Sequence, residues 1–497
     1  MFKALAWLDT RKLLLIILFA GIFIMAVRAP SDSDLWWHLA AGDWMRANGR
    51  IPTTDPFSHT MAGRPWIEQG WLPDLLTAHL FARLRYAGLG LLLASVVTAA
   101  WVLSFAQSQA HPFARAFATL LGAITSAVYW SMRPHIFSFL FFAGVLWILA
   151  QHRRGRRRVV WLLPPLMLLW ANSHAAWISG FIAIACYLLG EALERLLAGD
   201  RPAAWRPLLE LALATAVSIP LIAVNPHGPA MLTYPFKTVG IGALQEFIQE
   251  WAAPDFHQVH VQPFIWLLLC VVAALGLAGR RARFSELLLL AAFTYLALLA
   301  GRNIALCALV AAPILATYGQ AAGQHLWEML AGRYASLRRL NLASAPPRPA
   351  LGLLNALIVL LVLAAGVVKS LQPLSVAFNE KLQAEQFPAG AVAYLRAHHL
   401  PGEMFNSYNW GGYLLWKLYP GRRVFIDGRT DLYDDAFIRR YLDVTWARAG
   451  WEETLREYQV GYAVIEADSF LSRYLALLPA WREVYRDEIA VIFAHNP

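Results

Sequence analysis

The feature that most constrains this chain is a series of long apolar runs separated by short charged loops. A run must be about 20 residues long to cross the hydrocarbon core as a helix. A backbone in lipid must also satisfy its own hydrogen bonds, so such runs predict transmembrane helices. Only 15% of the residues are charged and 58% are hydrophobic, which excludes a soluble globular domain. The predicted spans are residues 13–28, 87–107, 115–131, 135–151, 159–172, 176–193, 207–224, 262–279, 285–301, 303–319 and 350–371.

The basic residues predict the orientation of these spans. Most arginines gather in alternate loops, including the run from Arg153 to Arg158, whereas the opposite side has near-isolated cations at Arg133, Lys237 and Arg302. Because short cytoplasmic loops carry excess Lys and Arg, the N-terminus is expected in the cytoplasm. The net charge of +10 therefore reflects topology rather than nucleic-acid binding.

The predicted spans divide the chain into four parts. Residues 1–319 form a transmembrane bundle that includes a long external loop, 29–86. A cytoplasmic connector, 320–349, leads to the last span, 350–371, and residues 372–497 follow outside the membrane. The first apolar run also has the layout of a cleavable secretory signal, an alternative that would leave the external loop untethered. The three cysteines lie inside apolar runs, which is typical of core residues rather than of disulfides.

An acidic motif, Asp32-Ser33-Asp34, opens the external loop and is followed at once by Trp36, Trp37 and His38. Either aspartate is a good N-cap for a helix that would run from residue 35 to residue 47 and stop at Asn48-Gly49. The same spacing lets two carboxylates share a divalent cation such as Mg²⁺ or Mn²⁺, or lets one act as a base that the other orients. Both interpretations stay open, and the aromatic residues beside the motif are candidates for contacting a substrate.

Two further acidic residues of the loop are catalytic candidates. Asp55 precedes a proline, so a turn is the simpler interpretation of its position. Glu68 lies between Trp66 and Trp71, where a carboxylate is harder to explain as surface decoration.

Cations and histidines at the external ends of spans are candidates for binding an anionic group. A charge at the hydrocarbon boundary is costly, which suggests a partner or a function. Snorkelling to lipid headgroups is the alternative for the cations, and a structural role is the alternative for the histidines. The candidates are Arg133, His135, His174, His227, Lys237 and Arg302.

The C-terminal segment predicts a small α/β domain. Residues 424–426, 462–465 and 490–493 are apolar runs of strand length, and residues 435–448 and 451–458 have helical patterns. Tyr408 and Trp410 accompany a Gly411-Gly412 pair, which indicates that the backbone approaches another group closely at this point. Asp427 and Arg429 flank a turn after the first run, where they either recognise an acceptor or only stabilise the turn.

This arrangement resembles the GT-C superfamily of membrane glycosyltransferases, including protein mannosyltransferases, aminoarabinose transferases and oligosaccharyltransferases. The residues that carry the resemblance are the acidic motif directly after the first span and the segments 34–39, 170–174 (Trp-Ala-Asn-Ser-His) and 410–413 (Trp-Gly-Gly-Tyr). In that superfamily the first external loop carries an acidic motif, and the enzymes take a sugar from a polyprenyl-phosphate carrier. The resemblance implies that Asp34 and Asp32 have catalytic roles.

The expected fold is thus a GT-C-like α-helical polytopic membrane protein with a C-terminal extracytoplasmic α/β domain. The expected function is transfer of a sugar from a polyprenyl-phosphate donor to an extracytoplasmic glycan, lipid or protein acceptor, in the bacterial cytoplasmic membrane. Two alternatives remain, a catalytically silent scaffold subunit and a transporter of a lipid-linked substrate. The sequence leaves the sugar, the acceptor, the metal dependence and the oligomeric state open.

Overall fold

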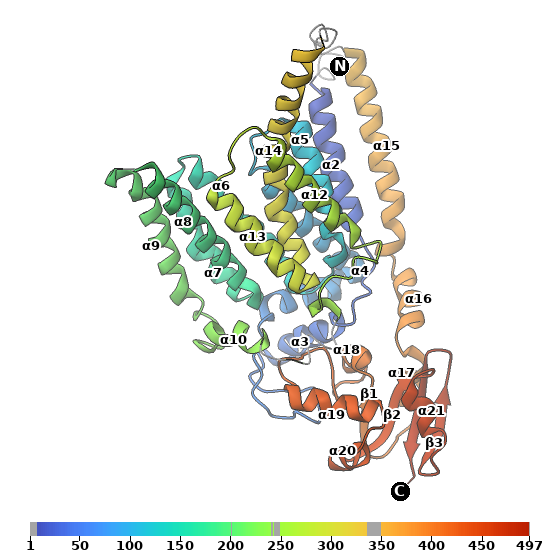
Figure 1. Ribbon diagram of the computed structural model, residues 1–497. Helices are drawn as coiled ribbons and strands as arrows, with labels where there is room; N and C mark the ends of the chain where they lie inside the picture. The colour runs from blue at the N-terminus through green and yellow to red at the C-terminus, as the bar shows by residue number, and fades with distance from the viewer. Residues whose placement is uncertain (1–6, 200, 240–241, 243–248, 335–348, 497) are drawn as a thin grey trace.

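The computed structural model describes residues 7–199, 201–239, 242, 249–334 and 349–496, which form a helical bundle and a smaller C-terminal domain (Figure 1). Each predicted apolar run coincides with a helix, in several cases extended by a short 3₁₀ turn. The helices of the bundle are α2 (Thr10–Ala26), α4 (Trp71–Phe105), α5 (Pro112–Ser126), α6 (His135–Arg153), α7 (Leu163–Ala171), α8 (Ile178–Ala198), α9 (Arg206–Leu221), α10 (Ala230–Val239), α12 (Gln262–Leu277), α13 (Phe284–Leu299), α14 (Ile304–Arg333) and α15 (Pro349–Leu374).

Within the described residues, five helical segments are long and apolar enough to cross a membrane unaided, which makes the chain a multi-pass membrane protein. They lie in α4, α6, α14 and α15, and in α8 with its preceding 3₁₀ turn. Two shorter apolar helices, α12 and α13, accompany them. The number of eleven spans and the orientation of the chain stay predictions.

The external loop contains its own helices. Helix α3 (Leu35–Asn48) ends at Gly49, whose φ of 63° is the left-handed conformation predicted for this stop. Helix α4 is interrupted at Arg85, which has a φ of 50°. Its first part therefore belongs to the external loop, and its second part enters the bundle where the span was predicted to begin. In Figure 1, α3 lies between the bundle and the C-terminal domain.

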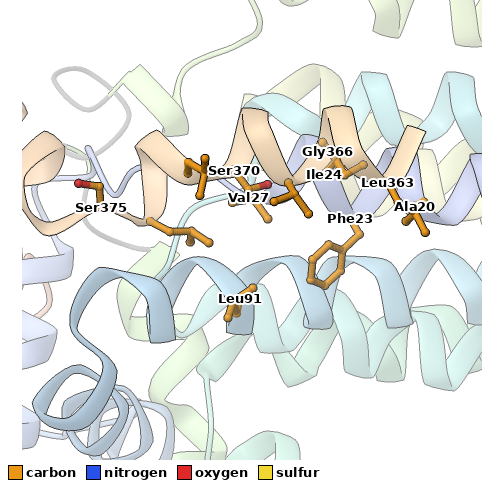
Figure 2. Close-up of a pocket in the computed structure, with 12 residues that line it drawn as sticks. Ala20, Phe23, Ile24, Val27, Leu91, Leu363, Gly366, Ser370 and Ser375 are labelled. Carbon is orange, nitrogen blue, oxygen red and sulfur yellow. The ribbon is translucent and has the colours of Figure 1, made fainter. Parts of the chain in front are cut away.

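Helix α15 runs alongside α2 and leaves an apolar groove between them. The side chain of Asn355 donates to the carbonyl of Leu8 at one end of this pair, and Lys369 donates to the carbonyl of Val27 at the other. Figure 2 shows the groove, which has a volume of about 640 Å³. Its lining comes from three helices and includes Phe23, Ile24, Leu91, Leu363 and Leu374.

The C-terminal domain is built around a mixed four-stranded sheet. The strands are β1 (Glu403–Asn406), β2 (Val460–Glu466), β3 (Trp481–Arg486) and β4 (Ala490–His495), in the order β1-β2-β4-β3. Strand β1 pairs with β2 in parallel, and the other two pairs are antiparallel. The helices around it are α16 (Val376–Gln386), α17 (Ala389–Ala397), α18 (Tyr408–Leu418), α19 (Asp435–Thr445), α20 (Trp451–Glu457) and α21 (Phe470–Leu475).

The prediction of a strand at residues 424–426 is wrong. This buried segment pairs with the external loop instead of the sheet, through an isolated bridge between Val424 and Ser58. The amide of Val424 donates to the carbonyl of Phe57, and the amide of His59 donates to the carbonyl of Val424. An apolar run indicates that the segment is buried, and it would be buried whether it paired with the sheet or with the external loop. The run therefore does not predict the pairing partner. The external loop and the C-terminal domain are consequently joined by backbone hydrogen bonds.

Residues 320–333 of the predicted connector continue α14, and residues 335–348 lie outside the described residues.

Candidate active site

Three carboxylates converge on the guanidinium group of Arg133, which precedes α6. Its Nε lies 2.9 Å from Oδ2 of Asp32, its Nη1 lies 2.7 Å from Oδ2 of Asp34, and its Nη2 lies 2.8 Å from Oε2 of Glu250. The first two come from the loop before α3, and the third comes from the 3₁₀ turn Gln249–Trp251. Segments about 100 residues apart in the sequence therefore meet at one point.

The aspartates do not cap α3 with their side chains. Asp34 holds the N-cap position, but its side chain makes no capping hydrogen bond. Oδ1 of Asp32 accepts from the amide of Asp34 at 3.0 Å, which fixes the turn between them. The capping interpretation therefore does not account for the carboxylate of Asp34, which points to Arg133 instead.

A second arginine completes the cluster and leaves it with excess negative charge. Nη1 of Arg302 lies 3.5 Å from Oε1 of Glu250, and its guanidinium lies 4.4 Å from the ring centre of Trp251. Three carboxylates thus face two guanidinium groups, a formal charge of −1. We define Asp32, Asp34, Arg133, Glu250 and Arg302 as the acidic cluster.

Burial and charge divide the carboxylates into different chemical roles. Burial raises the pKa of Asp34 to about 7, because the lowering by Arg133 is opposed by the like charges of Asp32 and Glu250. Burial also acts to raise the pKa of Glu250, but Arg133 and Arg302 outweigh it and lower that pKa to about 2. Asp34 is therefore the carboxyl of the two that exchanges a proton near neutral pH, as a general base must.

The wall beside Asp34 comes from the C-terminal domain. A Cβ atom on Gly428 would lie 2.0 Å from Oδ1 of Asp34 and 3.0 Å from Nε1 of Trp37, so only glycine permits this approach. The predicted close approach at Gly411-Gly412 is also confirmed, since a Cβ on Gly412 would lie 2.9 Å from the carbonyl oxygen of Ser33. Burial and then the charge of Asp34 raise the pKa of Tyr408.

Behind Trp37 lies a buried chain of acidic and imidazole groups. The Trp37 ring stacks on His38 with centres 3.5 Å apart, and Nδ1 of His38 lies 2.9 Å from Oδ1 of Asp74. Glu68, which is 1% exposed, faces Asp74, and burial raises its pKa to about 8. The facing carboxyl groups of Glu68 and Asp74 can share one proton, so this candidate is placed to support α3 from behind rather than to reach a substrate.

Two of the predicted histidines lie at the edge of the acidic cluster. Nε2 of His135 is 2.9 Å from the carbonyl oxygen of Tyr129, and Nδ1 of His174 is 2.9 Å from Oγ of Ser138. Burial and then the charge of Arg302 lower the pKa of His174, so its ring is neutral. Both rings have a structural partner and lie close to the arginines.

The third histidine belongs to a neighbouring polar network. The amide of His227 donates to Oδ1 of Asn225, whose Nδ2 donates to Oδ1 of Asn172, which also accepts from Nε1 of Trp71. The network ties the external loop to the 170–174 segment. Lys237, by contrast, is exposed on α10 and has no hydrogen bond or ion pair within the described residues, so it does not join the acidic cluster.

Asp55, Asp427 and Arg429 form a buried ion-pair triad. Nη1 of Arg429 lies 2.6 Å from Oδ1 of Asp55, and its Nη2 lies 2.7 Å from Oδ2 of Asp427. Asp55 also accepts from the amides of Phe57 and Ser58, and all three ionic side chains are fully buried. These residues therefore join the external loop to the C-terminal domain and are not open to a substrate.

Two of the predicted aromatic residues are also structural. Trp36 is fully buried and packs against Phe387, Tyr413 and Trp416. Trp410 is 5% exposed and lies in the buried face of α18. Trp36 therefore anchors α3 to the C-terminal domain.

The acidic motif does not fit a divalent cation in this arrangement. Oδ2 of Asp32 and Oδ2 of Asp34 both point to the guanidinium of Arg133, which holds the place that a shared metal ion would need. Among the described residues, no group of three or more His, Cys, Asp or Glu side chains has a metal-binding arrangement.

No sequence pattern singled out Glu250 or Asp74. Glu250 precedes a tryptophan in a loop near the predicted outer face, which is the only signal for it, and Asp74 looks like an ordinary first-turn acidic residue of α4.

Comparison with solved structures identifies the fold. No protein-family model and no curated protein matches the chain. The archaeal oligosaccharyltransferase AglB from Archaeoglobus fulgidus matches with a TM-score of 0.58 and 13% identity, over 93% of this chain and 70% of that one. ArnT from Cupriavidus metallidurans matches with a TM-score of 0.49 and 15% identity, over 97% of both chains. The expected resemblance is confirmed at the level of the fold, which the chain shares with this archaeal oligosaccharyltransferase.

Proposed function

We propose that the protein is a membrane glycosyltransferase that moves a sugar from a polyprenyl-phosphate carrier to an extracytoplasmic acceptor. The observation that carries the proposal is the acidic cluster. It combines a carboxyl group that titrates near neutral pH with a second arginine that is only loosely paired. The GT-C fold and the position of the cluster next to apolar helices agree with this chemistry.

Asp34 is the base in this proposal. Its carboxylate accepts the proton of the acceptor hydroxyl as that oxygen forms a bond to the anomeric carbon of the sugar. The bond between that carbon and the carrier phosphate breaks, and the electron pair leaves with the phosphate. Arg133 and Asp32 hold Asp34 in place.

Arg302 is the candidate for binding the departing phosphate. Arg133 already faces three carboxylates, so its guanidinium has no free fork for a phosphate, contrary to the sequence-based interpretation. Arg302 makes one long ion pair with Glu250 and lies over the Trp251 ring, so it can turn toward a phosphate without losing a short ion pair. Because Arg133 occupies the place between Asp32 and Asp34 that a divalent cation would need, no step is assigned to such a cation.

The groove between α2, α4 and α15 offers a place for the apolar tail of the carrier. It is lined by apolar side chains along its length, and it reaches Val27 and Ser375 at one end (Figure 2). Val27 precedes Asp32 by only five residues, so that end of the groove opens close to the acidic motif.

We propose the bacterial cytoplasmic membrane as the location, with the acidic cluster and the C-terminal domain outside the cytoplasm. The basic loops at the opposite end of the bundle support this orientation. The product would then be an envelope glycan or glycolipid.

A transfer assay with radiolabelled lipid-linked sugars and a membrane lipid extract tests the proposal. We expect transfer by the wild-type protein, loss of transfer in Asp34→Asn, and retention in Asp43→Asn. Asp43 lies on the same helix, half-exposed and paired with Arg46, and is the matched control. Transfer that survives a chelator agrees with a reaction in which no divalent cation takes part. Absence of transfer from every donor in the extract would favour the scaffold alternative, and carrier movement without transfer would favour the transporter.

A further inference from the structure

A second cavity, which is polar, lies at the end of the bundle remote from the acidic cluster. It has a volume of about 240 Å³ and is lined by arginines 153, 157, 195 and 283, with Glu191 and Tyr187. Helix α6 begins beside Arg133 and ends at Arg153, so about 27 Å of helix separates the two places. We call this space the arginine cavity.

Two of these arginines have structural partners. Nη1 of Arg153 lies 2.7 Å from Oε1 of Glu286, and Nη1 of Arg195 lies 3.1 Å from Oε2 of Glu191. The first pair connects the end of α6 with the beginning of α13, and the second lies within α8. Packing of the helix ends accounts for both cations.

The other two arginines are not explained by packing. Arg157 is exposed and has no ion pair or side-chain hydrogen bond within the described residues. Arg283 is half-exposed, and its Nη1 stays 3.9 Å from Oε1 of Glu191. Four guanidinium groups thus meet two carboxylates, Glu191 and Glu286, which leaves a formal excess of two positive charges around a hollow.

We propose that the arginine cavity binds a phosphate group. A guanidinium fork matches two phosphate oxygens, and an excess of two positive charges complements a phosphate. The buried ring of His152, held between Tyr187 and the carbonyl of Pro207, closes one side of the cavity. This site is separate from the proposed transfer reaction and does not depend on it.

The surroundings favour a phospholipid headgroup as the source of this phosphate. Trp161 and Leu162 lie on the same short 3₁₀ segment as Arg157 and are 47% and 50% exposed. Leu196 and Leu197, which directly follow Arg195, are also exposed. Exposed tryptophan and leucine next to arginine are typical of the membrane interface, where lipid phosphates lie.

The test is lipid binding by the purified full-length protein in detergent. Native mass spectrometry and thermal melting would be recorded with phosphatidylglycerol, with phosphatidylcholine and with inorganic phosphate. We expect phosphatidylglycerol to bind and to raise the melting temperature. The R157Q/R283Q variant should bind it about tenfold more weakly, since two charge-assisted contacts are lost.

The matched control is R156Q/R158Q, which removes the same charge from exposed neighbours that do not line the cavity. R157Q alone should also weaken binding, and among the described residues it removes no side-chain hydrogen bond or ion pair that could hold the fold. Equal protection by inorganic phosphate alone would assign a free phosphate as ligand and keep the site. Unchanged binding in R157Q/R283Q, or an equal loss in the control, would overturn the proposal.

Discussion

Nη1 of Arg133 lies 2.7 Å from Oδ2 of Asp34, although 99 residues separate them in the sequence. The same guanidinium also faces Asp32 and Glu250, so it organises the carboxylates rather than awaiting an anion. This relationship gives the proposed base its position and its charge environment.

Replacing Asp34 by Asn should remove transfer while the fold persists. Loss of a general base costs about 10²- to 10⁴-fold in rate. The carboxylate makes no cap, and the amide oxygen can still accept from Arg133, so the melting temperature should change little. Initial rates and thermal melts of Asp34→Asn and Asp43→Asn would be compared. A near-normal rate in Asp34→Asn refutes the assignment.

The rate should rise with pH through about 7. The raised pKa means that Asp34 is protonated, and unable to act as a base, below about 7. Glu250→Gln removes one of the negative charges that raise the pKa of Asp34, and Arg133 then forms ion pairs with Asp32 and Asp34 only. The rise should therefore move to lower pH in this variant. A pH profile of kcat/KM that is unchanged by Glu250→Gln would contradict the role of the cluster charge.

Arg302→Lys should weaken donor use about tenfold and Arg302→Ala about a hundredfold, because lysine keeps the charge but loses the fork. The measurement is the dependence of the initial rate on donor concentration. Arg280→Lys, at the other end of the bundle, is the control. Normal donor use by Arg302→Lys would leave Arg302 with a structural role only.

Arg429→Met should destabilise the protein by about 3–5 kcal/mol, since it leaves two buried carboxylates without a cationic partner. Arg64→Gln removes an exposed pair with Asp434 and should cost less than about 1 kcal/mol. Thermal or denaturant unfolding in detergent measures both. Equal stability of the two variants would show that the triad does not hold the loop to the domain.

Cysteine labelling tests the topology. The probes are placed at exposed positions. Probes at Ala62 and Asn409 should react with an impermeant reagent from outside, and a probe at Arg158 should not. The probes are introduced into a variant in which the three native cysteines are replaced, so that only the probe reacts. Reaction of the Arg158 probe alone would invert the orientation.

The sequence predicts the helices well because hydropathy and helix length determine them locally. It also brings Arg133, His135, His174 and Arg302 to one depth, because each lies at a span end. Depth does not reveal which span ends are neighbours, so the convergence on Arg133 and the participation of Glu250 could not be predicted.

In the C-terminal domain, the sequence likewise predicts the buried apolar segments but not their pairing partners. The runs at 462–465 and 490–493 pair with each other in the sheet, whereas the equally apolar run at 424–426 pairs with residues 57–60. Asp55 and Arg429 are each compatible with a local turn. Only the tertiary structure shows that they are partners.

The separation of Asp55 and Arg429 by 374 residues has a consequence for biogenesis. In the proposed orientation the external loop is exported early during synthesis, while the arginine that neutralises Asp55 is made near the end of the chain. The loop would therefore reach its final shape only after the C-terminal domain has crossed the membrane and folded. Half-made chains would remain inactive, which would keep lipid-linked sugars from being used by an incomplete protein.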